Sequence, residues 1–404
     1  MIRRVAFLSL HTSPLVQPGS GDGGGMNVYI DELARTLVDR GVGVDVFTRE
    51  TAKVPRRDVE VMPGYRVIHI TAGPPAVRSM ADLPETVAPF ADGVIAHMRR
   101  NTYDLVHSHY WLSGWAGLVV KRAVGIPLAN SFHTLGRVKD ATRRVGEPPE
   151  PLIRIAAEQE VIAGSDCVIA STSYEADDLT RRYQADPARL CVTHPGVDHQ
   201  LFTAGSQPEA RDLLGWGPGP VVLFVGRIQP LKGLDVAVEA FGRIRAEIPD
   251  ARMVIVGGPS GLNGVTELRQ IHARVAELHL ESRVEFVRPR PHQEIASYYR
   301  AADVLLVPSR SESFGLVAAE AQACGLPVVA ARVGGLAYTV EDATSGFLVD
   351  DWDPANFAAA AMKILLNEDL ADRLSKGAVE FAGRFSWEVA ADRLLELYAG
   401  ITGG

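Results

Sequence analysis

The chain has 404 residues, with 41 lysines and arginines against 49 aspartates and glutamates, so its formal net charge is −8. This length allows two domains of ordinary size, each with its own core. Lysine and arginine are not gathered into a long tract, and proteins that bind nucleic acid need a concentrated basic surface. We therefore expect no nucleic-acid partner.

Cysteine usage and the start of the chain both favour a cytoplasmic protein. Cys167, Cys191 and Cys324 are scattered and include no Cys-x-x-Cys pair, which argues against a disulfide framework and a zinc site. Met1-Ile-Arg-Arg leads into an apolar run that is too short for a signal peptide or a membrane-spanning helix.

Short apolar runs alternate with helical patterns along the first half of the chain. Near-continuous apolar strands that alternate with helices are typical of parallel sheets covered on both faces. We predict strands over 5–10, 44–48, 65–70, 105–108, 127–132 and 167–171, and helices near 26–40, 87–100, 112–122 and 150–163.

The pattern restarts after residue 202, following a stretch that contains Pro195 and Gly196 and preceding the Gly- and Pro-rich residues 205–220. We therefore predict an N-terminal domain over 1–198 and a C-terminal domain over 199–382. A final amphipathic helix is expected within 383–404, because apolar residues recur there at helical spacing. The new strands are predicted over 221–225, 252–256, 283–287, 303–307, 327–330 and 347–349.

Two carboxylates flank a glycine-bearing turn in the run Glu312-Ser-Phe-Gly-Leu-Val-Ala-Ala-Glu320. The run predicts a loop followed by a helix over 314–323, with Gly315 in its first turn. Backbone amides of Phe314, Gly315, Leu316 and Val317, with the positive end of the helix dipole, form a site for a phosphate or diphosphate.

Glu312 lies in the predicted loop and Glu320 well inside the helix, so the two acids are too far apart to share a proton. We expect them to hold hydroxyl groups on the two sides of a diphosphate, one on a sugar and the other on a ribose. The alternative is that Ser313 only caps the helix and Glu312 is a solvated loop acid.

A second loop presents two cations, Arg227 and Lys232, after the strand 221–225. Only six of the 41 basic residues are lysines, which makes Lys232 conspicuous. Arginine offers a flat fork to phosphate oxygens and lysine a compact charge, a suitable pair for neutralising a diphosphate leaving group. The alternative is a solvated surface loop.

The Glu-x7-Glu pair, the strand-Gly-Arg-x4-Lys loop and Gly334-Gly335 resemble the donor half of retaining glycosyltransferases of the GT-B fold, family 4. The runs 11–29, His107-Ser-His-Tyr-Trp-Leu-Ser-Gly114 and His133-Thr134 resemble more narrowly the N-acetylglucosaminyltransferases that begin mycothiol synthesis, and more distantly sucrose-phosphate synthases. The resemblance covers nearly the whole chain. It implies an α/β fold of two Rossmann-like, doubly wound domains facing each other across a cleft, with the last helix crossing back to the first domain.

By this resemblance the co-substrate is a nucleoside-diphosphate sugar, with UDP-sugar as the family default and GDP-sugar as the alternative. Arg227, Lys232 and the helix-start amides should neutralise its diphosphate, so we expect no metal and no other cofactor. The resemblance assigns catalysis to His133, Glu312, Arg227 and Lys232. It assigns donor binding to Gly25, Arg227, Lys232, Arg290, Glu312, Phe314, Gly315, Leu316, Val317 and Glu320.

The acceptor side departs from the family pattern. Three residues that grip the phosphate of inositol phosphate in the mycothiol enzymes match Tyr110, Thr134 and Arg154, but the lysine of that set falls on Met80. Methionine cannot neutralise a dianion. Either the acceptor is still inositol phosphate, or the pocket takes a less charged group, and we expect a changed acceptor.

Two more residues are expected near the acceptor. Arg78 is close to Met80 in sequence and offers a substitute cation, and Asn27 is implied by the resemblance to face the acceptor. A basic loop with Arg137, Lys139, Arg143 and Arg144 is interpreted as solvated or as an acceptor-capturing loop. Docking to anionic lipid is disfavoured, because acids are interspersed and no aromatic-rich amphipathic helix accompanies the loop.

We therefore predict a retaining hexosyltransferase that acts on a small polar acceptor, such as a cyclitol, a cyclitol phosphate or a small thiol or thione. The expected reaction is a metal-independent, same-face displacement through an oxocarbenium-like transition state. Two alternatives stay open: a GT-B-like sugar-nucleotide epimerase and a catalytically silent sugar-nucleotide-binding regulator. The resemblance also implies a homodimer.

Overall fold

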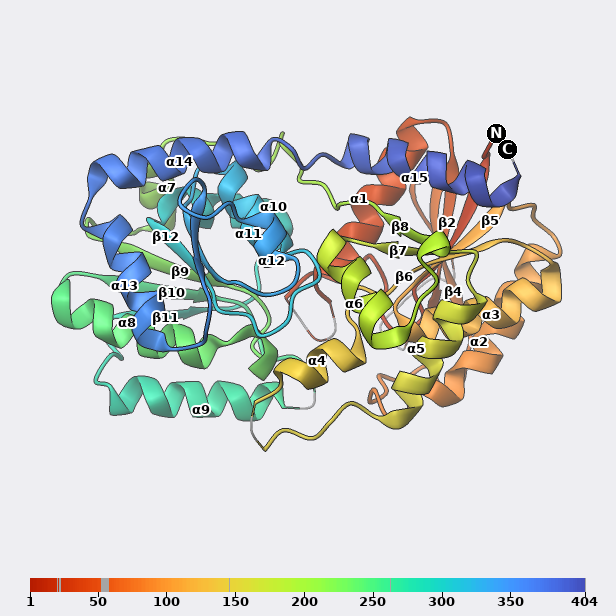
Figure 1. Cartoon of the computed structure of the whole chain (residues 1–404), viewed down its shortest axis with the longest axis horizontal. Coiled ribbons are helices and arrows are strands. Elements are labelled where there is room, and N and C mark those ends of the chain that lie inside the picture. The colour runs from red at the N-terminus through yellow and green to blue at the C-terminus, as the bar shows by residue number, and fades with distance from the viewer. Residues whose placement is uncertain (20, 22, 52–57, 145, 262, 404) are drawn as a thin grey trace.

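The computed structural model describes residues 1–19, 21, 23–51, 58–144, 146–261 and 263–403. Figure 1 shows two α/β lobes side by side, with the red-to-yellow first half of the chain on the right and most of the green-to-blue second half on the left. Each lobe holds one sheet covered by helices on both faces. The prediction of two Rossmann-like domains is therefore confirmed.

The N-terminal lobe is built on an eight-stranded sheet of order β3-β4-β2-β1-β5-β6-β7-β8. All its pairs are parallel except β3 with β4 at the edge. The strands are β1 Arg4–Leu8, β2 Gly43–Arg49, β3 Asp58–Met62, β4 Tyr65–Ile70, β5 Leu105–His109, β6 Leu128–Ser131, β7 Cys167–Ala170 and β8 Leu190–Val192.

Alternate side chains of β1 enter two apolar clusters, one on each face of this sheet. Ala6 and Leu8 belong to one cluster, and Val5 and Phe7 to the other, as the two-residue period of a strand requires. The covering helices are α1 Gly25–Asp39, α2 Val87–Met98, α3 Trp111–Val124, α4 Gly136–Thr142, α5 Leu152–Gly164 and α6 Ser173–Tyr183, with 3₁₀ turns η1 Leu83–Thr86 and η2 Pro187–Arg189.

The C-terminal lobe has a six-stranded, all-parallel sheet of order β11-β10-β9-β12-β13-β14. Every strand predicted in this half is present, with bounds shifted by at most one residue. The strands are β9 Val221–Val225, β10 Arg252–Val256, β11 Val284–Val287, β12 Val304–Val307, β13 Val328–Ala331 and β14 Gly346–Val349. Its helices are α7 Gln207–Leu214, α8 Leu234–Glu247, α9 Gly264–Glu277, α10 His292–Ala301, α11 Leu316–Ala323, α12 Leu336–Thr339, α13 Pro354–Leu365 and α14 Glu368–Ala382, with the 3₁₀ turn η3 Pro230–Lys232.

The last helix, α15 Trp387–Thr402, leaves the C-terminal lobe and lies along the N-terminal lobe beside α1 (Figure 1). Trp387, Leu394 and Tyr398 are buried in the same apolar cluster as Val5 and Phe7. The expected crossing of the final helix is thus present. The domain limits at 198 and 382 stay a prediction.

The chain passes between the lobes twice, and the two connecting segments touch at Gly196. A Cβ atom on Gly196 would lie 2.1 Å from the backbone nitrogen of Trp387, so only glycine fits there. The neighbouring Val197 amide donates to the Phe385 carbonyl at 3.2 Å. The two segments that connect the lobes are therefore joined by backbone contacts.

Two of the three free cysteines, described above as scattered, are brought together by the sheet. The sulfur atoms of Cys167 on β7 and Cys191 on β8 are 2.6 Å apart. The pairing of β7 with β8 aligns Ile169 with Cys191, which leaves Cys167 diagonal to Cys191. Sequence spacing of 24 residues hides this contact.

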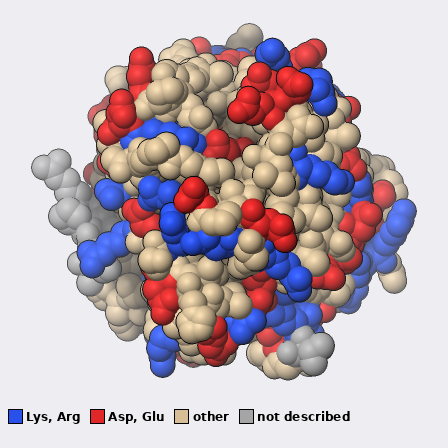
Figure 2. All heavy atoms as spheres, turned by 90° about the vertical axis from the view of Figure 1, so that its left-hand side faces the viewer, with Lys and Arg blue, Asp and Glu red and all other residues tan. Residues whose placement is uncertain are grey.

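Charged side chains are mixed on the end of the C-terminal lobe. Figure 2 shows lysines and arginines together with aspartates and glutamates over this face. No helix in the described part of the chain is long and apolar enough to cross a membrane.

Candidate functional site

The predicted functional residues follow the carboxyl ends of parallel strands, where ligands bind in open α/β sheets. In the N-terminal lobe, His133 lies two residues beyond β6. In the C-terminal lobe, Arg227 follows β9, and Glu312 lies in the loop after β12. The lobes meet at these loops, because the Ser313 hydroxyl donates a 2.6 Å hydrogen bond to the His133 carbonyl.

Lys232 and Glu312 form an ion pair with 2.5 Å between Nζ and Oε2, and both side chains are about one-fifth exposed. The loop that carries Lys232 is held close to the end of β12 at Gly233, whose φ is +68°. A Cβ atom there would lie 2.1 Å from the Pro308 carbonyl oxygen. The two charged residues are thus fixed next to each other by backbone packing.

The helix start differs from the prediction. Helix α11 begins at Leu316, and Gly315 precedes it with a φ of +98°. A residue in this left-handed conformation cannot lie in the first turn of a right-handed helix. The amides of Leu316 and Val317 lie in that first turn, where a helix offers no internal acceptor, so the predicted anion site would be centred on these two residues.

Gly334 and Gly335 support the loop that carries Glu312. A Cβ atom on Gly334 would lie 2.4 Å from the Glu312 carbonyl oxygen, and one on Gly335 would lie 2.2 Å from that of Ser313. The Gly335 amide also donates to the Glu312 carbonyl at 2.8 Å. This close packing is a physical reason for the paired glycines.

The glycine-rich loop before α1 contacts the C-terminal lobe. A Cβ atom on Gly24 would lie 3.1 Å from Arg227 Nε, and one on Gly25 would lie 3.4 Å from a Leu316 methyl. The Ser260 hydroxyl donates to the Gly21 carbonyl at 2.6 Å. The structure thus brings the predicted glycine loop to Arg227 and the start of α11, while Ser20 and Asp22 of this loop lie outside the described residues.

Arg290 lies next to this same contact. A Cβ atom on Gly19 would lie 3.4 Å from the Cβ atom of Pro289, the residue before Arg290. The Arg290 side chain is half exposed and 3.8 Å from Glu294. Arg290, which is predicted to bind the donor, therefore follows a residue at the junction of the lobes.

Glu320 is buried on α11 and already has two partners. His292 Nε2 lies 2.8 Å from its Oε1, and the Tyr299 hydroxyl donates to its Oε2 at 3.1 Å. Burial opposes the charge on His292, but Glu320, together with Glu32 and Asp198, raises the pKa of the imidazole. Sequence reasoning found Glu320 and missed both partners, which come from another helix.

His133 has the strained backbone expected of a site residue, with φ +59°. A histidine in this conformation carries a cost of about 1–3 kcal/mol that the surroundings must offset. Its Nε2 lies 3.1 Å from Nδ1 of His109, and its ring packs on Tyr29 at 5.0 Å. Burial lowers the pKa of His133 to about 3, so the ring is neutral at physiological pH.

The other two histidines of the motif support this arrangement from the sheet. His107 and His109 are both fully buried. His107 lies 2.7 Å from the Tyr398 hydroxyl of α15 and 2.9 Å from the Ser131 hydroxyl. The last helix is therefore linked directly to the strand that leads into the site.

His11, at the head of the first matching run, lies beside the predicted site residues, although the sequence did not single it out. Its ring packs on Tyr110 at 4.5 Å, and its Nδ1 is buried without a hydrogen-bond partner among the described residues. Burial, followed by the charges of Arg227, His133 and Arg154, lowers its pKa to about 3. Its place after β1, at the same sheet edge as His133, was the available signal.

Tyr110, Thr134 and Arg154 converge in the N-terminal lobe. The Arg154 guanidinium lies 5.2 Å over the Tyr110 ring and donates to the Thr134 hydroxyl at 3.1 Å. It also pairs with Glu158 at 2.7 Å and with Glu150 at 2.9 Å. Arg154 is thus buried and already neutralised by two carboxylates.

Asn27, Arg78 and Met80 are not brought into this group by the printed contacts of their side chains. The buried Asn27 amide bonds with Gly24 and Thr12, at 2.9 and 2.8 Å, and so braces the glycine loop. Arg78 pairs with Glu85 at 3.1 Å. Met80 is half-buried against the N-terminal apolar cluster, so its direct contact with an acceptor stays a prediction, as do those of Asn27 and Arg78.

The predicted basic loop is partly helical, because Arg137 and Lys139 lie on α4. Lys139 pairs with Glu150 beside Arg154. Arg144 instead reaches the C-terminal lobe, where it lies 2.6 Å from Glu267 and 3.3 Å from Asp235. The interpretation of Arg144 as a solvated residue is therefore wrong, because it makes an ionic contact between the lobes. Capture of the acceptor by this loop stays a prediction.

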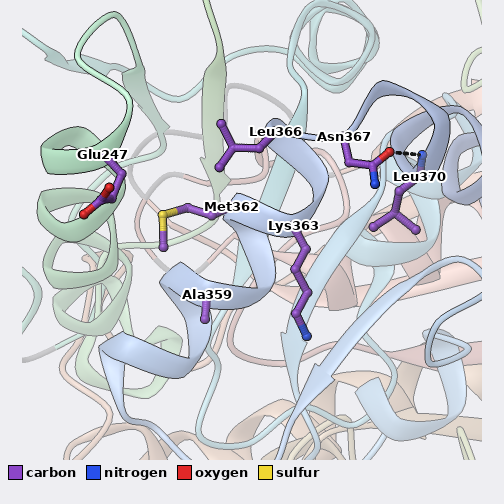
Figure 3. A pocket seen from close by; sticks show the side chains of 7 residues that line it. All are labelled: Glu247, Ala359, Met362, Lys363, Leu366, Asn367 and Leu370. Carbon is purple, nitrogen blue, oxygen red and sulfur yellow. Dashed lines mark hydrogen bonds between the residues drawn. The ribbon is translucent and has the colours of Figure 1, made fainter.

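An apolar hollow of about 590 Å³ lies elsewhere, on the outside of the C-terminal lobe. Figure 3 shows Glu247 of α8 and Met362 of α13 on its wall, with Leu366 and Leu370 at one end. None of the residues predicted for the site lines it. The loops at the junction of the lobes, rather than this hollow, hold the candidate active site.

Comparisons with known proteins agree with the geometry. The model described as Glycosyltransferase Family 4 matches residues 23–201, and the model described as Glycosyl transferases group 1 matches residues 206–381. The chain is 47% identical over 408 residues to D-inositol 3-phosphate glycosyltransferase 2 of Catenulispora acidiphila, covering 98% of this chain and 95% of that protein. It is 46% identical over 405 residues to D-inositol 3-phosphate glycosyltransferase of Thermobispora bispora, covering 98% and 94%.

Solved structures share the whole architecture. Sucrose-phosphate synthase from Thermosynechococcus elongatus matches with a TM-score of 0.92 and 33% identity, covering 99% of each chain. Anabaena HepE, at 20% identity and a TM-score of 0.79 over 98% of this chain and 100% of that one, shares the fold. The chain therefore belongs to the GT-B glycosyltransferase family that includes the D-inositol 3-phosphate glycosyltransferases.

Proposed function

We propose that this glycosyltransferase moves a hexosyl group from a UDP-sugar to a cyclitol phosphate, with retention at the anomeric carbon. The observation that carries the proposal is the 2.6 Å hydrogen bond from the Ser313 hydroxyl to the His133 carbonyl, which joins the two lobes. It puts the loop that holds Glu312 beside a histidine at the edge of the first sheet. GDP-sugar is the alternative donor.

The diphosphate would bind at Arg227, Lys232 and the amides of Leu316 and Val317. Lys232 is held by Glu312 at 2.5 Å, and the two amides are held by helix α11; groups that are fixed before binding stabilise a leaving group effectively as its charge develops. We propose that they make a metal unnecessary and that no other cofactor is used. Glu312 would hold a hydroxyl of the transferred sugar.

In the proposed step the bond from the anomeric carbon to the diphosphate oxygen breaks, and a bond to the acceptor oxygen forms on the same face. The acceptor proton passes to the departing phosphate oxygen. His133 would lie beside the sugar as a neutral ring, because burial lowers its pKa to about 3. It therefore supports the transition state by hydrogen bonding and position, without acting as a charged acid.

Inositol 3-phosphate is the first acceptor to test, because relatives with 46–47% identity over 98% of this chain carry that name. A second candidate is an uncharged or amino cyclitol, favoured by Met80 and by the two carboxylates that neutralise Arg154. Small thiols and thiones complete the acceptor panel.

The experiment is to find the donor by thermal shift with UDP- and GDP-sugars, and then to detect products with each acceptor by mass spectrometry. Release of free nucleoside diphosphate only when an acceptor is present supports transfer. A changed sugar without net diphosphate release would indicate an epimerase. Binding of a donor with no product from any acceptor would favour a silent regulator.

Three further expectations are part of the proposal. We propose that the protein is cytoplasmic, that it has no nucleic-acid or membrane partners, and that it forms a homodimer. Sedimentation of the purified protein measures the oligomeric state directly.

A further inference from the structure

His292 and Glu320 form an enclosed charged pair in the C-terminal lobe that has no assigned purpose as a pair. The imidazole Nε2 and the carboxylate Oε1 are 2.8 Å apart, and the two side chains are only 17% and 7% exposed. Phe202 packs on the imidazole ring at 4.9 Å. The histidine is therefore held in one place, beside a buried acid.

The carboxylate of Glu320 is restrained at both oxygens. His292 contacts Oε1, and the Tyr299 hydroxyl donates to Oε2 at 3.1 Å. An ionised carboxylate has about four acceptor positions, so roughly two are left for other donors. Two neighbouring acceptor positions, one on each oxygen, suit a pair of adjacent hydroxyl groups such as the ribose diol.

The charges around His292 favour its protonated form. Glu320 lies on α11, Glu32 on α1 of the other lobe, and Asp198 in the crossing segment. Burial of the ring opposes protonation, but these three acids together raise the pKa of His292. A cation at this position compensates the buried Glu320 charge, and a buried carboxylate without such a partner would be costly.

We propose that His292 is a positioning residue for the donor: it fixes Glu320 so that the carboxylate accepts both hydroxyl groups of the nucleotide ribose. Tyr299 holds the second oxygen in the same way. This inference rests on the proposed function, since it requires a nucleoside diphosphate in the site. It adds two residues, His292 and Tyr299, to the determinants of donor recognition.

The test is a binding measurement that separates the ribose contacts from the rest of the donor. Calorimetric dissociation constants are measured for UDP, 2′-deoxy-UDP and 3′-deoxy-UDP, with the wild type and with His292→Ala, His292→Gln and Tyr299→Phe. His272→Gln is the matched control, because His272 is an exposed histidine of the same lobe on α9. The quantity compared is the ratio of deoxy-UDP to UDP dissociation constants.

In the wild type we expect each missing hydroxyl to weaken binding about tenfold or more, as for a hydrogen bond to a charged group. His292→Ala should reduce that ratio to within about threefold of unity. Tyr299→Phe should reduce the ratio of dissociation constants less than His292→Ala does. His292→Gln should keep most of the wild-type ratio, because the glutamine amide still donates a hydrogen bond to Glu320. The His272→Gln control should keep the full wild-type ratio.

Two results overturn the inference while leaving donor binding intact. One is equal binding of UDP and its deoxy analogues by the wild type. The other is a His292→Ala variant that binds all three probes more weakly but with an unchanged ratio, which would show only structural support. Failure of the wild type to bind UDP or GDP contradicts the proposed function itself, and the inference falls with it.

Discussion

Lys232 Nζ lies 2.5 Å from Glu312 Oε2, so the cation assigned to the diphosphate and the acid assigned to the sugar restrain each other. They reach this position from loops after two different strands, β9 and β12. A donor that binds with its diphosphate at Lys232 and its sugar at Glu312 would meet both side chains already oriented. The pair therefore links leaving-group neutralisation to sugar placement.

Replacing Lys232 by alanine should reduce kcat about 100- to 1,000-fold, as removal of one preorganised charge-stabilising group does in other enzymes. The measurement is nucleoside diphosphate release at saturating donor and acceptor. Lys376→Ala is the matched control, since Lys376 is exposed on α14. Wild-type turnover in Lys232→Ala would remove Lys232 from the reaction.

Met80→Lys tests the charge of the acceptor pocket. Met80 stands where the family has a lysine, and Arg78, its basic neighbour, is paired with Glu85. We expect the variant to lower KM for inositol phosphate about tenfold and to leave KM for unphosphorylated inositol unchanged, because one added ion pair contacts the phosphate alone. An unchanged KM for inositol phosphate would exclude position 80 as the determinant.

Acid should destabilise the protein through its buried histidines. His107 is fully buried, and its pKa is lowered from 6.5 to about 3, first by burial and then by His133. The unfolded chain takes up a proton below about pH 6.5 and the folded chain does not, so stability is full above that pH and falls as the pH drops toward 3. Each unit in this window costs about 1.4 kcal/mol for such a histidine.

The comparison is the thermal midpoint at pH 7.5 and pH 5.5 for the wild type and His107→Gln. Glutamine can keep bonds to Tyr398 and Ser131 but does not titrate, so the variant should lose less stability on acidification. His272→Gln, at an exposed position, should behave like the wild type. Equal pH dependence in His107→Gln and the wild type would contradict the assignment.

Arg144 should hold the lobes in their closed arrangement. It lies 2.6 Å from Glu267 and 3.3 Å from Asp235 across the lobes, and hydrogen bonding and charge from these acids raise its pKa against the effect of burial. Arg144→Gln should increase the radius of gyration in X-ray scattering and raise KM for the donor several-fold.

Arg143→Gln is the control for this change, because Arg143 bonds only to the Glu147 carbonyl of its own loop among the described contacts. It should leave both measurements unchanged. An Arg144→Gln variant as compact as the wild type, with unaltered KM, would show that the contact does not set the lobe arrangement.

Much of the fold follows from hydrophobic runs alone. Strands buried on both faces, such as Val221–Val225, are continuous apolar segments and were predicted within a residue. The edge strand Asp58–Met62 was missed because it alternates exposed acids with half-buried apolar residues. The strand Leu190–Val192 was missed because it is only three residues long.

Site residues could be predicted where they lie in short sequence motifs, and could not be predicted where their position depends on packing between distant segments. Glu312, Lys232 and His133 lie in recognisable loops. The left-handed conformation of Gly315, the contact of Arg144 with Glu267, and the pairing of His292 with Glu320 depend on distant segments. Sequence spacing carries no signal for such contacts.

The most direct test of the proposed retaining transfer is the anomeric configuration of the product. A UDP-α-sugar and the accepted cyclitol are incubated with the enzyme, and the product is followed by proton NMR at the anomeric position from the first minutes. The account predicts an α-linked product and stoichiometric release of UDP. A β-linked product, formed with the same release, would contradict it.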